Sequence, residues 1–285
     1  EEIPTVLTLH AEIMHTAGCE HAYDCMKWIN GCHDCNRIKG CLTHYIRDDA
    51  MCAYKRMQQS FDGFRKLIVV GVSDWLTNRA KQSAIFKNSN AKFMTIENGL
   101  DLVAFHPIQL QNNPLKNRIN VSRPFILHVT PNFLHPLKGG HYVLELAKMH
   151  PEWDFVIIGY NGDSELPKNI TTISHTDDKE ELSWYYNIAS ITLLTSKRET
   201  FSMVCAESLA CGTPVVGFEA GGPESVFVGN FAKFVEYGNL NALDNAVSEM
   251  IVSKPIVDTE LIRKRFAAEE MANKYCLIYR ELATQ

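Results

Sequence analysis

The feature that most constrains this chain is a regular alternation of short β-rich runs with longer helical stretches, which begins near Arg123. Such alternation is typical of a parallel sheet whose strands are joined by helices. The six expected strands cover residues 125–129, 154–158, 170–173, 190–195, 214–217 and 231–235. They predict a doubly wound domain, in which ligands bind beyond the carboxyl ends of the strands.

A shorter set of the same kind precedes this domain. Strands are expected at residues 4–10, 67–72 and 93–96, with helices over 50–64 and after Ser73, which suits a helix N-cap. Strand 4–10 is apolar enough to be expected inside a sheet, so we expect that an amino-terminal portion is missing. The predicted fold class is therefore α/β, with two Rossmann-like lobes of parallel sheet and the first lobe truncated at its amino terminus.

The expected domain limits are residues 1–110 for the first lobe and 111–260 for the second. A polar stretch over 106–123, rich in Gln, Asn and Pro, predicts the linker between them. Residues 258–283 carry apolar residues at helical spacing and predict one amphipathic helix. Residues 261–285, which include most of this helix, are expected to pack back toward the first lobe.

Composition narrows the function. A net charge of −5 and a pI of about 6.1 disfavour a protein that binds nucleic acid or an anionic membrane surface. No run of 18 apolar residues and no signal peptide is present, so a cytoplasmic protein is expected, with peripheral association at the inner face of the membrane left open. Nine cysteines favour reduced thiols or a metal site over a disulfide framework.

The stretch from Lys197 to Gly217 carries the strongest functional signal. It predicts a helix that begins near Phe201 beyond a strand, where free amide groups can hold phosphate. Glu199 and Glu207 are eight residues apart, roughly 12 Å if the segment is helical throughout, so they could hold opposite ends of an elongated ligand. Alternatively, Glu199 is a first-turn residue favoured by the helix dipole and Glu207 is a solvated surface residue. The small and apolar neighbours of Glu207 make an unpaired charge costly, so it needs a partner.

The Glu199-x7-Glu207 pattern, with its Ala-Cys-Gly-Thr-Pro-Val-Val continuation over 210–216 and Gly-Gly-Pro-Glu over 221–224, resembles glycosyltransferase family four. That family adopts the two-lobed GT-B fold. The segments 72–76, 97–101 and 105–107 extend the resemblance over nearly the whole chain. It implies a retaining hexosyltransferase of the bacterial polysaccharide type, with an acceptor-side first lobe and a donor-binding second lobe.

The resemblance also implies the partners and the roles of the site residues. The donor is a nucleotide diphosphate sugar, with UDP favoured over GDP, and the acceptor is a saccharide or a lipid-linked saccharide. Glu207 accepts hydrogen bonds from the ribose, and Glu199 contacts the transferred sugar near the reacting carbon as a catalytic residue. Amides around Phe201, Ser202 and Met203 meet sugar hydroxyls and phosphate. No cofactor is required for the chemistry.

Three further candidates lie near strand ends. Lys138, in a turn with Gly139, can bring positive charge close to a diphosphate, although a plain surface lysine is the alternative. Many members of the family carry an arginine shortly before this lysine, whereas this chain has Asn132 and Phe133, of which Asn132 offers only a neutral donor. His10 lies where the family places a second catalytic-site residue, a histidine facing the donor sugar; a satisfied core histidine is the alternative.

Four cysteines, Cys19, Cys25, Cys32 and Cys35, fall within seventeen residues and end in a Cys-x2-Cys pair. This spacing predicts structural zinc, with His21 or His33 able to replace a ligand, and four thiols without metal are the alternative.

Other functions were weighed against the transferase. A sugar-nucleotide epimerase of the same fold would bind the same donor and need no acceptor. A phosphorylase would need a pyridoxal lysine motif, which is not seen. The absence of a basic stripe disfavours a zinc-dependent nucleic-acid module, and the absence of Gly-x-Gly-x-x-Gly disfavours a dehydrogenase.

Overall fold

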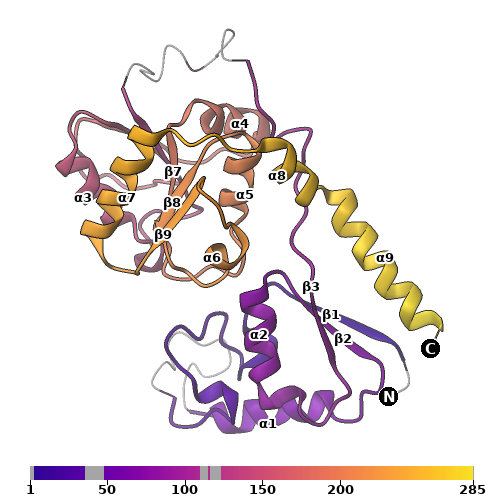
Figure 1. Ribbon diagram of the computed structural model, residues 1–285. Helices are drawn as coiled ribbons and strands as arrows, with labels where there is room; N and C mark the ends of the chain where they lie inside the picture. Colours follow the sequence, from indigo (N-terminus) through magenta and orange to yellow (C-terminus); the bar gives the residue numbers. More distant parts are fainter. Residues whose placement is uncertain (1–2, 36–47, 110–114, 116–122, 285) are drawn as a thin grey trace. The chain divides into compact units, whose positions relative to one another are not determined.

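The computed structural model describes residues 3–35, 48–109, 115 and 123–284. The chain divides into two compact units: residues 1–98 with 271–285, and residues 99–270. Each unit is built on its own parallel sheet (Figure 1). The predicted linker over 106–123 falls largely outside the described residues.

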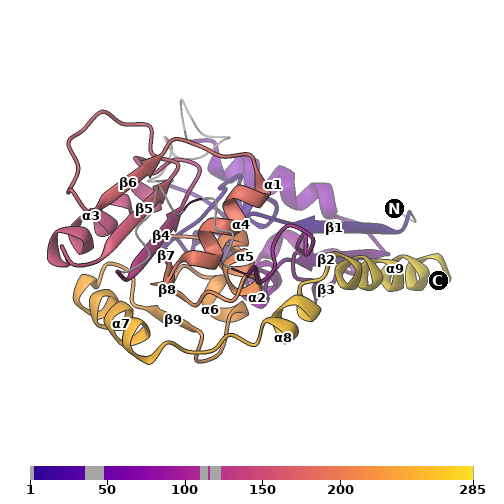
Figure 2. The same ribbon diagram turned by 90° about the horizontal axis from the view of Figure 1, so that it is seen from above.

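The second unit contains a six-stranded sheet in the order β6-β5-β4-β7-β8-β9, and all of its pairings are parallel (Figure 2). Its strands are β4 (Phe125–Val129), β5 (Asp154–Ile158), β6 (Ile170–Ile173), β7 (Ile191–Leu194), β8 (Val215–Phe218) and β9 (Ala232–Val235). All six predicted strands are confirmed, three of them with the predicted limits. The predicted doubly wound α/β domain is therefore confirmed.

Helices cover both faces of this sheet (Figure 2). They are α3 (Gly140–Met149), α4 (Lys179–Ile188), α5 (Met203–Ala210), the short α6 (Pro223–Val226) and α7 (Leu240–Ser253). Side chains of α3 and α7 share one buried apolar cluster with Ile191 and Leu193 of β7. The intervening residue, Thr192, faces the other side, where it accepts a hydrogen bond from Ser208 of α5 at 2.8 Å. The alternation along β7 thus assigns α5 to the face opposite α3 and α7.

The direction of winding reverses between β4 and β7, which are neighbours in the sheet but not in the sequence. At such a switch point the connections leave the sheet in opposite directions and open a crevice beyond the carboxyl ends of the strands. The segments that follow β4 and β7 should therefore carry the ligand site of this unit.

The first unit holds a three-stranded parallel sheet in the order β1-β2-β3, made of β1 (Thr5–Leu9), β2 (Leu67–Gly71) and β3 (Lys92–Thr95). Its amino-terminal part contains the helices α1 (Ala50–Phe61) and α2 (Asp74–Gln82), and Ser73 caps α2 by accepting from the Leu76 amide at 3.2 Å, as predicted. Short 3-10 turns lie at Ile13–His15, Lys27–Ile29 and Ala84–Phe86 here, and at Pro136–Lys138 in the second unit.

The placement of β1 differs from the prediction, because β1 lies at an edge of the described sheet and not inside it. Its apolar character has another source. Val6 packs against a cluster that includes Ile278 and Leu282 of the carboxy-terminal helix, and Thr8 shares a 3.0 Å hydrogen bond with Tyr275. The edge strand is thus covered by a distant part of the chain.

The single helix predicted over 258–283 is wrong: the chain forms α8 (Thr259–Arg265) and α9 (Ala268–Thr284) with a break at Phe266 and Ala267. The Phe266 carbonyl accepts from the Leu100 amide at 2.7 Å, and the Phe266 ring packs against Phe201 and Phe227. These tertiary contacts divert the backbone. In the described part of the chain, no helix has the length and apolar character needed to cross a membrane.

Candidate functional site

An ion pair lies at the switch point of the second unit. Lys138 follows β4, Glu199 follows β7, and the lysine ammonium donates to Glu199 Oε1 at 2.8 Å. The two side chains remain 29% and 21% exposed, so a ligand can reach both. The fold therefore unites two predicted site residues that are 61 positions apart in the sequence.

The turn that carries Lys138 is pressed against the end of β7. Gly139 has φ +69°, and a Cβ added there would lie 2.2 Å from the Thr195 carbonyl oxygen. Only glycine combines that backbone conformation with that approach. The turn thus brings the Lys138 main chain close to the residues that follow β7.

Glu199 is held by main-chain bonds on both sides. Its amide donates to the Ala220 carbonyl at 3.0 Å, and its carbonyl accepts from the Gly222 amide at 2.9 Å. Gly222 is needed, because a Cβ there would lie 2.1 Å from the Thr200 carbonyl oxygen. The Glu224 carboxylate fixes the same loop by accepting from the amides of Ala220 and Gly221.

Glu199 precedes helix α5, which begins at Met203. The alternative of a first-turn glutamate is therefore wrong, and the separation estimated for a continuous helix between the two glutamates does not apply. The reason is the extended bridge between Glu199 and Gly221, which keeps this segment out of the helix.

The start of α5 contains an unusual residue. Ser202 is the N-cap, has φ +75°, and accepts from the Cys205 amide at 3.4 Å. A non-glycine residue with positive φ is strained, and such strain concentrates at functional sites. The Phe201 ring is buried against Phe227, so only its main chain can meet a ligand, whereas the Met203 side chain is 37% exposed.

Glu207 is half-buried on α5 and does have a partner, as its apolar neighbours predict. Tyr186 of α4 donates its hydroxyl to Glu207 Oε2 at 2.9 Å. Burial raises the pKa of Glu207 to about 7, although the Tyr186 hydrogen bond and the charge of Lys179 act in the opposite direction. The alternative of a solvated surface glutamate is wrong. Because burial raises the pKa of Tyr186 well above its usual value, Tyr186 stays a donor.

Two further predicted residues take no part in the ion pair. Asn132 is exposed, and its Oδ1 accepts from the Leu134 amide at 3.2 Å, which closes a local turn. His10 belongs to the first unit, where it is exposed immediately after β1. It is not a buried core histidine, and its contact with a donor sugar stays a prediction.

The four cysteines of the predicted zinc site line one pocket of about 350 Å³ in the first unit, together with Asp24 and His33. Among residues 3–35, 48–109, 115 and 123–284, no group of three or more His, Cys, Asp or Glu side chains is arranged to hold a metal ion. Structural zinc therefore stays a prediction.

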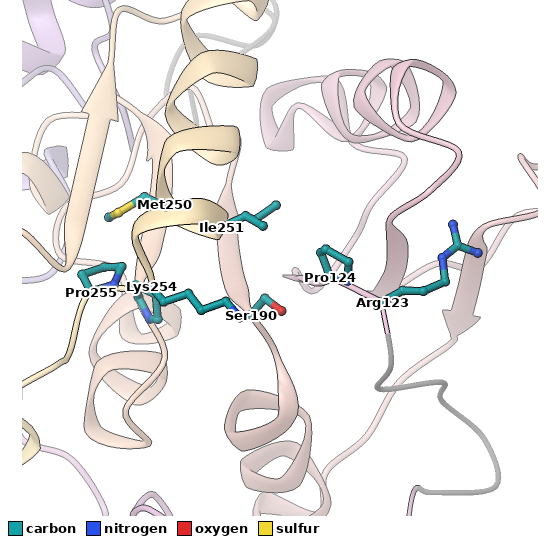
Figure 3. Close-up of a pocket in the computed structure, with 8 residues that line it drawn as sticks. Arg123, Pro124, Ser190, Met250, Ile251, Lys254 and Pro255 are labelled. Carbon is teal, nitrogen blue, oxygen red and sulfur yellow. The ribbon is translucent and has the colours of Figure 1, made fainter.

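A cavity of about 390 Å³ lies at the amino ends of strands in the six-stranded sheet (Figure 3). Pro124, Ser190 and Pro214, which line it, immediately precede β4, β7 and β8. The Arg123 guanidinium pairs with Asp154 at 3.3 Å, and none of the lining residues carries a carboxylate. This cavity is separate from the ion pair at the carboxyl ends of the strands.

Three contributors to the site were missed by the sequence analysis. Tyr186 donates to Glu207, Glu224 fixes the loop that bonds Glu199, and His128 contacts Thr195 behind the Lys138 turn. Glu224 could have been found from the sequence, because it belongs to the Gly-Gly-Pro-Glu segment over 221–224 that carries part of the family resemblance. Nothing in the local sequence marks the other contacts, because each joins residues from different elements.

Known proteins resemble this chain in sequence and in fold. A family model described as glycosyl transferases group 1 matches residues 111–264, a little over half of the chain. An uncharacterized glycosyltransferase of Haemophilus influenzae is 32% identical over 96 residues, which cover 30% of this chain and 27% of that protein. The N-acetyl-alpha-D-glucosaminyl L-malate synthase of Bacillus anthracis is 22% identical over 232 residues, which cover 74% of this chain and 59% of that protein.

The matches thus span 27% and 59% of the lengths of these two curated relatives. Among solved structures, Anabaena HepE in complex with UDP has a TM-score of 0.68 and 16% identity, and covers 99% of this chain and 72% of that one. This likeness shows the fold, two parallel α/β sheets of the GT-B type, and confirms the predicted α/β class with two Rossmann-like sheets.

Proposed function

This chain belongs to the glycosyl transferases group 1 family, and from that premise we propose that it transfers a sugar from a nucleotide diphosphate sugar to a saccharide or lipid-linked saccharide. We propose further that the transfer retains the configuration of the sugar, as the resemblance of the Glu199-x7-Glu207 motif to family four implies. UDP is the favoured donor nucleotide, because the structurally similar HepE has been solved with UDP and with UDP-glucose.

The observation that carries this proposal is the Lys138–Glu199 ion pair at the switch point of the sheet, beside the start of α5. A diphosphate is bound by positive charge and amide donors. Lys138 supplies the charge, and the start of α5 supplies the amides. The half-buried Glu207, bonded by Tyr186, supplies a carboxylate suited to accept hydrogen bonds from ribose hydroxyls.

The residues of the site match the charges that develop during transfer. The bond from the anomeric carbon to the β-phosphate oxygen breaks, and its electron pair leaves with the nucleoside diphosphate. Lys138 and the α5 amides stabilise this growing negative charge, while the Glu199 carboxylate stabilises the positive charge on the sugar ring. The acceptor hydroxyl forms the new bond at the anomeric carbon, and its proton passes to the departing diphosphate oxygen.

The proposal can be tested without knowing the acceptor, by following slow hydrolysis of UDP-glucose by proton NMR. Retention predicts that α-glucose appears first, before mutarotation, together with an equal amount of UDP. β-Glucose appearing first would contradict retention. Conversion into another UDP-sugar with no release of UDP would instead establish the epimerase alternative.

We also propose that the cysteine pocket holds structural zinc. The proposal is supported by the convergence of Cys19, Cys25, Cys32 and Cys35 on one pocket, since thiolates are preferred zinc ligands. The chain purified without chelator is expected to contain about one zinc ion, measured by elemental analysis. Cys32→Ser should lose the metal, whereas Cys276→Ser, which changes an exposed thiol on α9, should keep it. A folded wild-type chain that takes up no added zinc would contradict this proposal.

A further inference from the structure

A chain of hydrogen bonds runs from the core of the second unit to the turn that carries Lys138. His128 lies on β4, where its side chain is buried, and its Nε2 is 3.0 Å from the hydroxyl oxygen of Thr195. The Thr195 hydroxyl donates in turn to the main-chain carbonyl of Lys138 at 2.8 Å. Thr195 is itself buried and directly follows β7.

The direction of this chain follows from counting protons. A threonine hydroxyl has a single proton, and a carbonyl oxygen can only accept. Because Thr195 uses its proton on the Lys138 carbonyl, its oxygen must accept from a protonated His128 Nε2. His128 is therefore the Nε2–H tautomer, and its other ring nitrogen, Nδ1, is buried and has no hydrogen-bond partner among the described residues.

The tautomer is not altered by ordinary changes of pH. Burial, followed by the nearby charge of Lys138, lowers the pKa of His128 to about 3. The imidazole is neutral above that pH, so the order of donors and acceptors persists. A neutral histidine can hold the turn without placing a buried charge next to the Lys138 ammonium.

Two other contacts hold the turn that carries Lys138 against the segment that follows β7. The Lys197 amide donates to the Leu137 carbonyl at 2.9 Å, and Gly139 allows its close approach to the Thr195 carbonyl. The main chain on both sides of Lys138 is thus fixed to residues 195–197, which lead directly to Glu199. The main chain that carries Lys138 and the main chain that leads to Glu199 are therefore fixed to each other.

We propose that His128 and Thr195 are positioning residues, which fix the main chain at Lys138 so that its ammonium meets the diphosphate of the donor. This inference rests on the proposed function. It assigns to two buried side chains, neither of which would touch the donor, a specific effect on diphosphate binding.

Thr195→Val tests the proposal, because valine keeps the shape of threonine and removes the hydroxyl. The readout is the ratio of the affinities for UDP and UMP, measured by competition, since only UDP carries the β-phosphate. The ratio is expected to fall about tenfold, which corresponds to one misplaced charge-assisted hydrogen bond. Thr195→Ser, which restores the hydroxyl, should return the ratio to the wild-type value.

Thr192→Val is the matched control. Thr192 is buried on β7 three positions earlier, and its hydroxyl oxygen accepts from Ser208, outside the chain that leads to Lys138. It should change thermal stability without changing the ratio. If Thr195→Val fails to fold, Thr195→Ala provides the same readout with a smaller side chain.

The possible outcomes distinguish a failure of the positioning role from a failure of the proposed function. A wild-type ratio in the folded Thr195 variant, even with a lowered melting temperature, overturns the positioning role and leaves the proposed function intact. An equal fall in the Thr192 and Thr195 variants also overturns it, because the effect would then be general. A wild-type chain that does not prefer UDP over UMP overturns the proposed role of Lys138 and this inference with it.

Discussion

Replacing Lys138 by methionine is expected to weaken UDP binding roughly 10- to 100-fold, which is the usual effect of losing one hydrogen bond to a charged group. Methionine keeps a long, flexible side chain and removes the charge. In the structure the Lys138 ammonium lies at the switch point of the sheet, 2.8 Å from Glu199 Oε1. Calorimetric titration of both proteins with UDP measures the effect.

Glu199→Gln, unlike the Lys138 variant, should not weaken UDP binding. It removes the carboxylate that competes for the Lys138 ammonium and that repels the diphosphate, so UDP affinity should rise or hold. Sugar transfer should nevertheless fall about 100-fold or more, because the charge that faces the reacting carbon is lost. If both variants weakened UDP equally, the ion pair would be a structural contact and not part of a diphosphate site.

UDP affinity is also expected to depend on pH through Glu207, whose pKa is raised by burial to about 7. In the proposed site the ribose hydroxyls donate to Glu207, which is the stronger acceptor when it is ionised. The carboxylate is half ionised at about pH 7, is largely ionised one pH unit higher, and is lost as the pH falls through that value. From pH 8 to pH 6 its population, and with it the affinity, should fall about tenfold.

Two variants isolate this effect. Glu207→Gln cannot titrate, so it reports the pH dependence due to the terminal phosphate of UDP, which itself titrates near pH 6. Tyr186→Phe removes the hydrogen bond that lowers the pKa of Glu207, and should move the midpoint to higher pH. A pH profile that is identical in wild type and Glu207→Gln would contradict a role for this carboxylate.

Much of the second unit could be predicted from its sequence. Strands such as β4 and β5 are short and mostly apolar because both faces of a doubly wound sheet are buried. The need of Glu207 for a partner was also predictable, since its neighbours on α5 are small and apolar. The partner was not, because Tyr186 lies on α4 and only the packing of the two helices brings them together.

Features that depend on tertiary contacts escaped prediction. The break between α8 and α9 follows from Phe266 packing with Phe201 and Phe227, and helical periodicity continues through it. The position of Glu199 ahead of α5 depends on its bridge to Gly221. The positive φ of Ser202 contradicts residue preference altogether, which is expected where a site imposes its own backbone conformation.

The most direct test of the central claim is calorimetric titration of the purified chain with UDP, beside Glu207→Ala and with GDP as the competing nucleotide. We expect saturable one-to-one binding of UDP, weaker binding of GDP, and a marked loss of UDP affinity in Glu207→Ala. A folded wild-type chain that binds neither nucleotide, or that binds UDP equally well without the Glu207 carboxylate, would contradict a donor site at the start of α5.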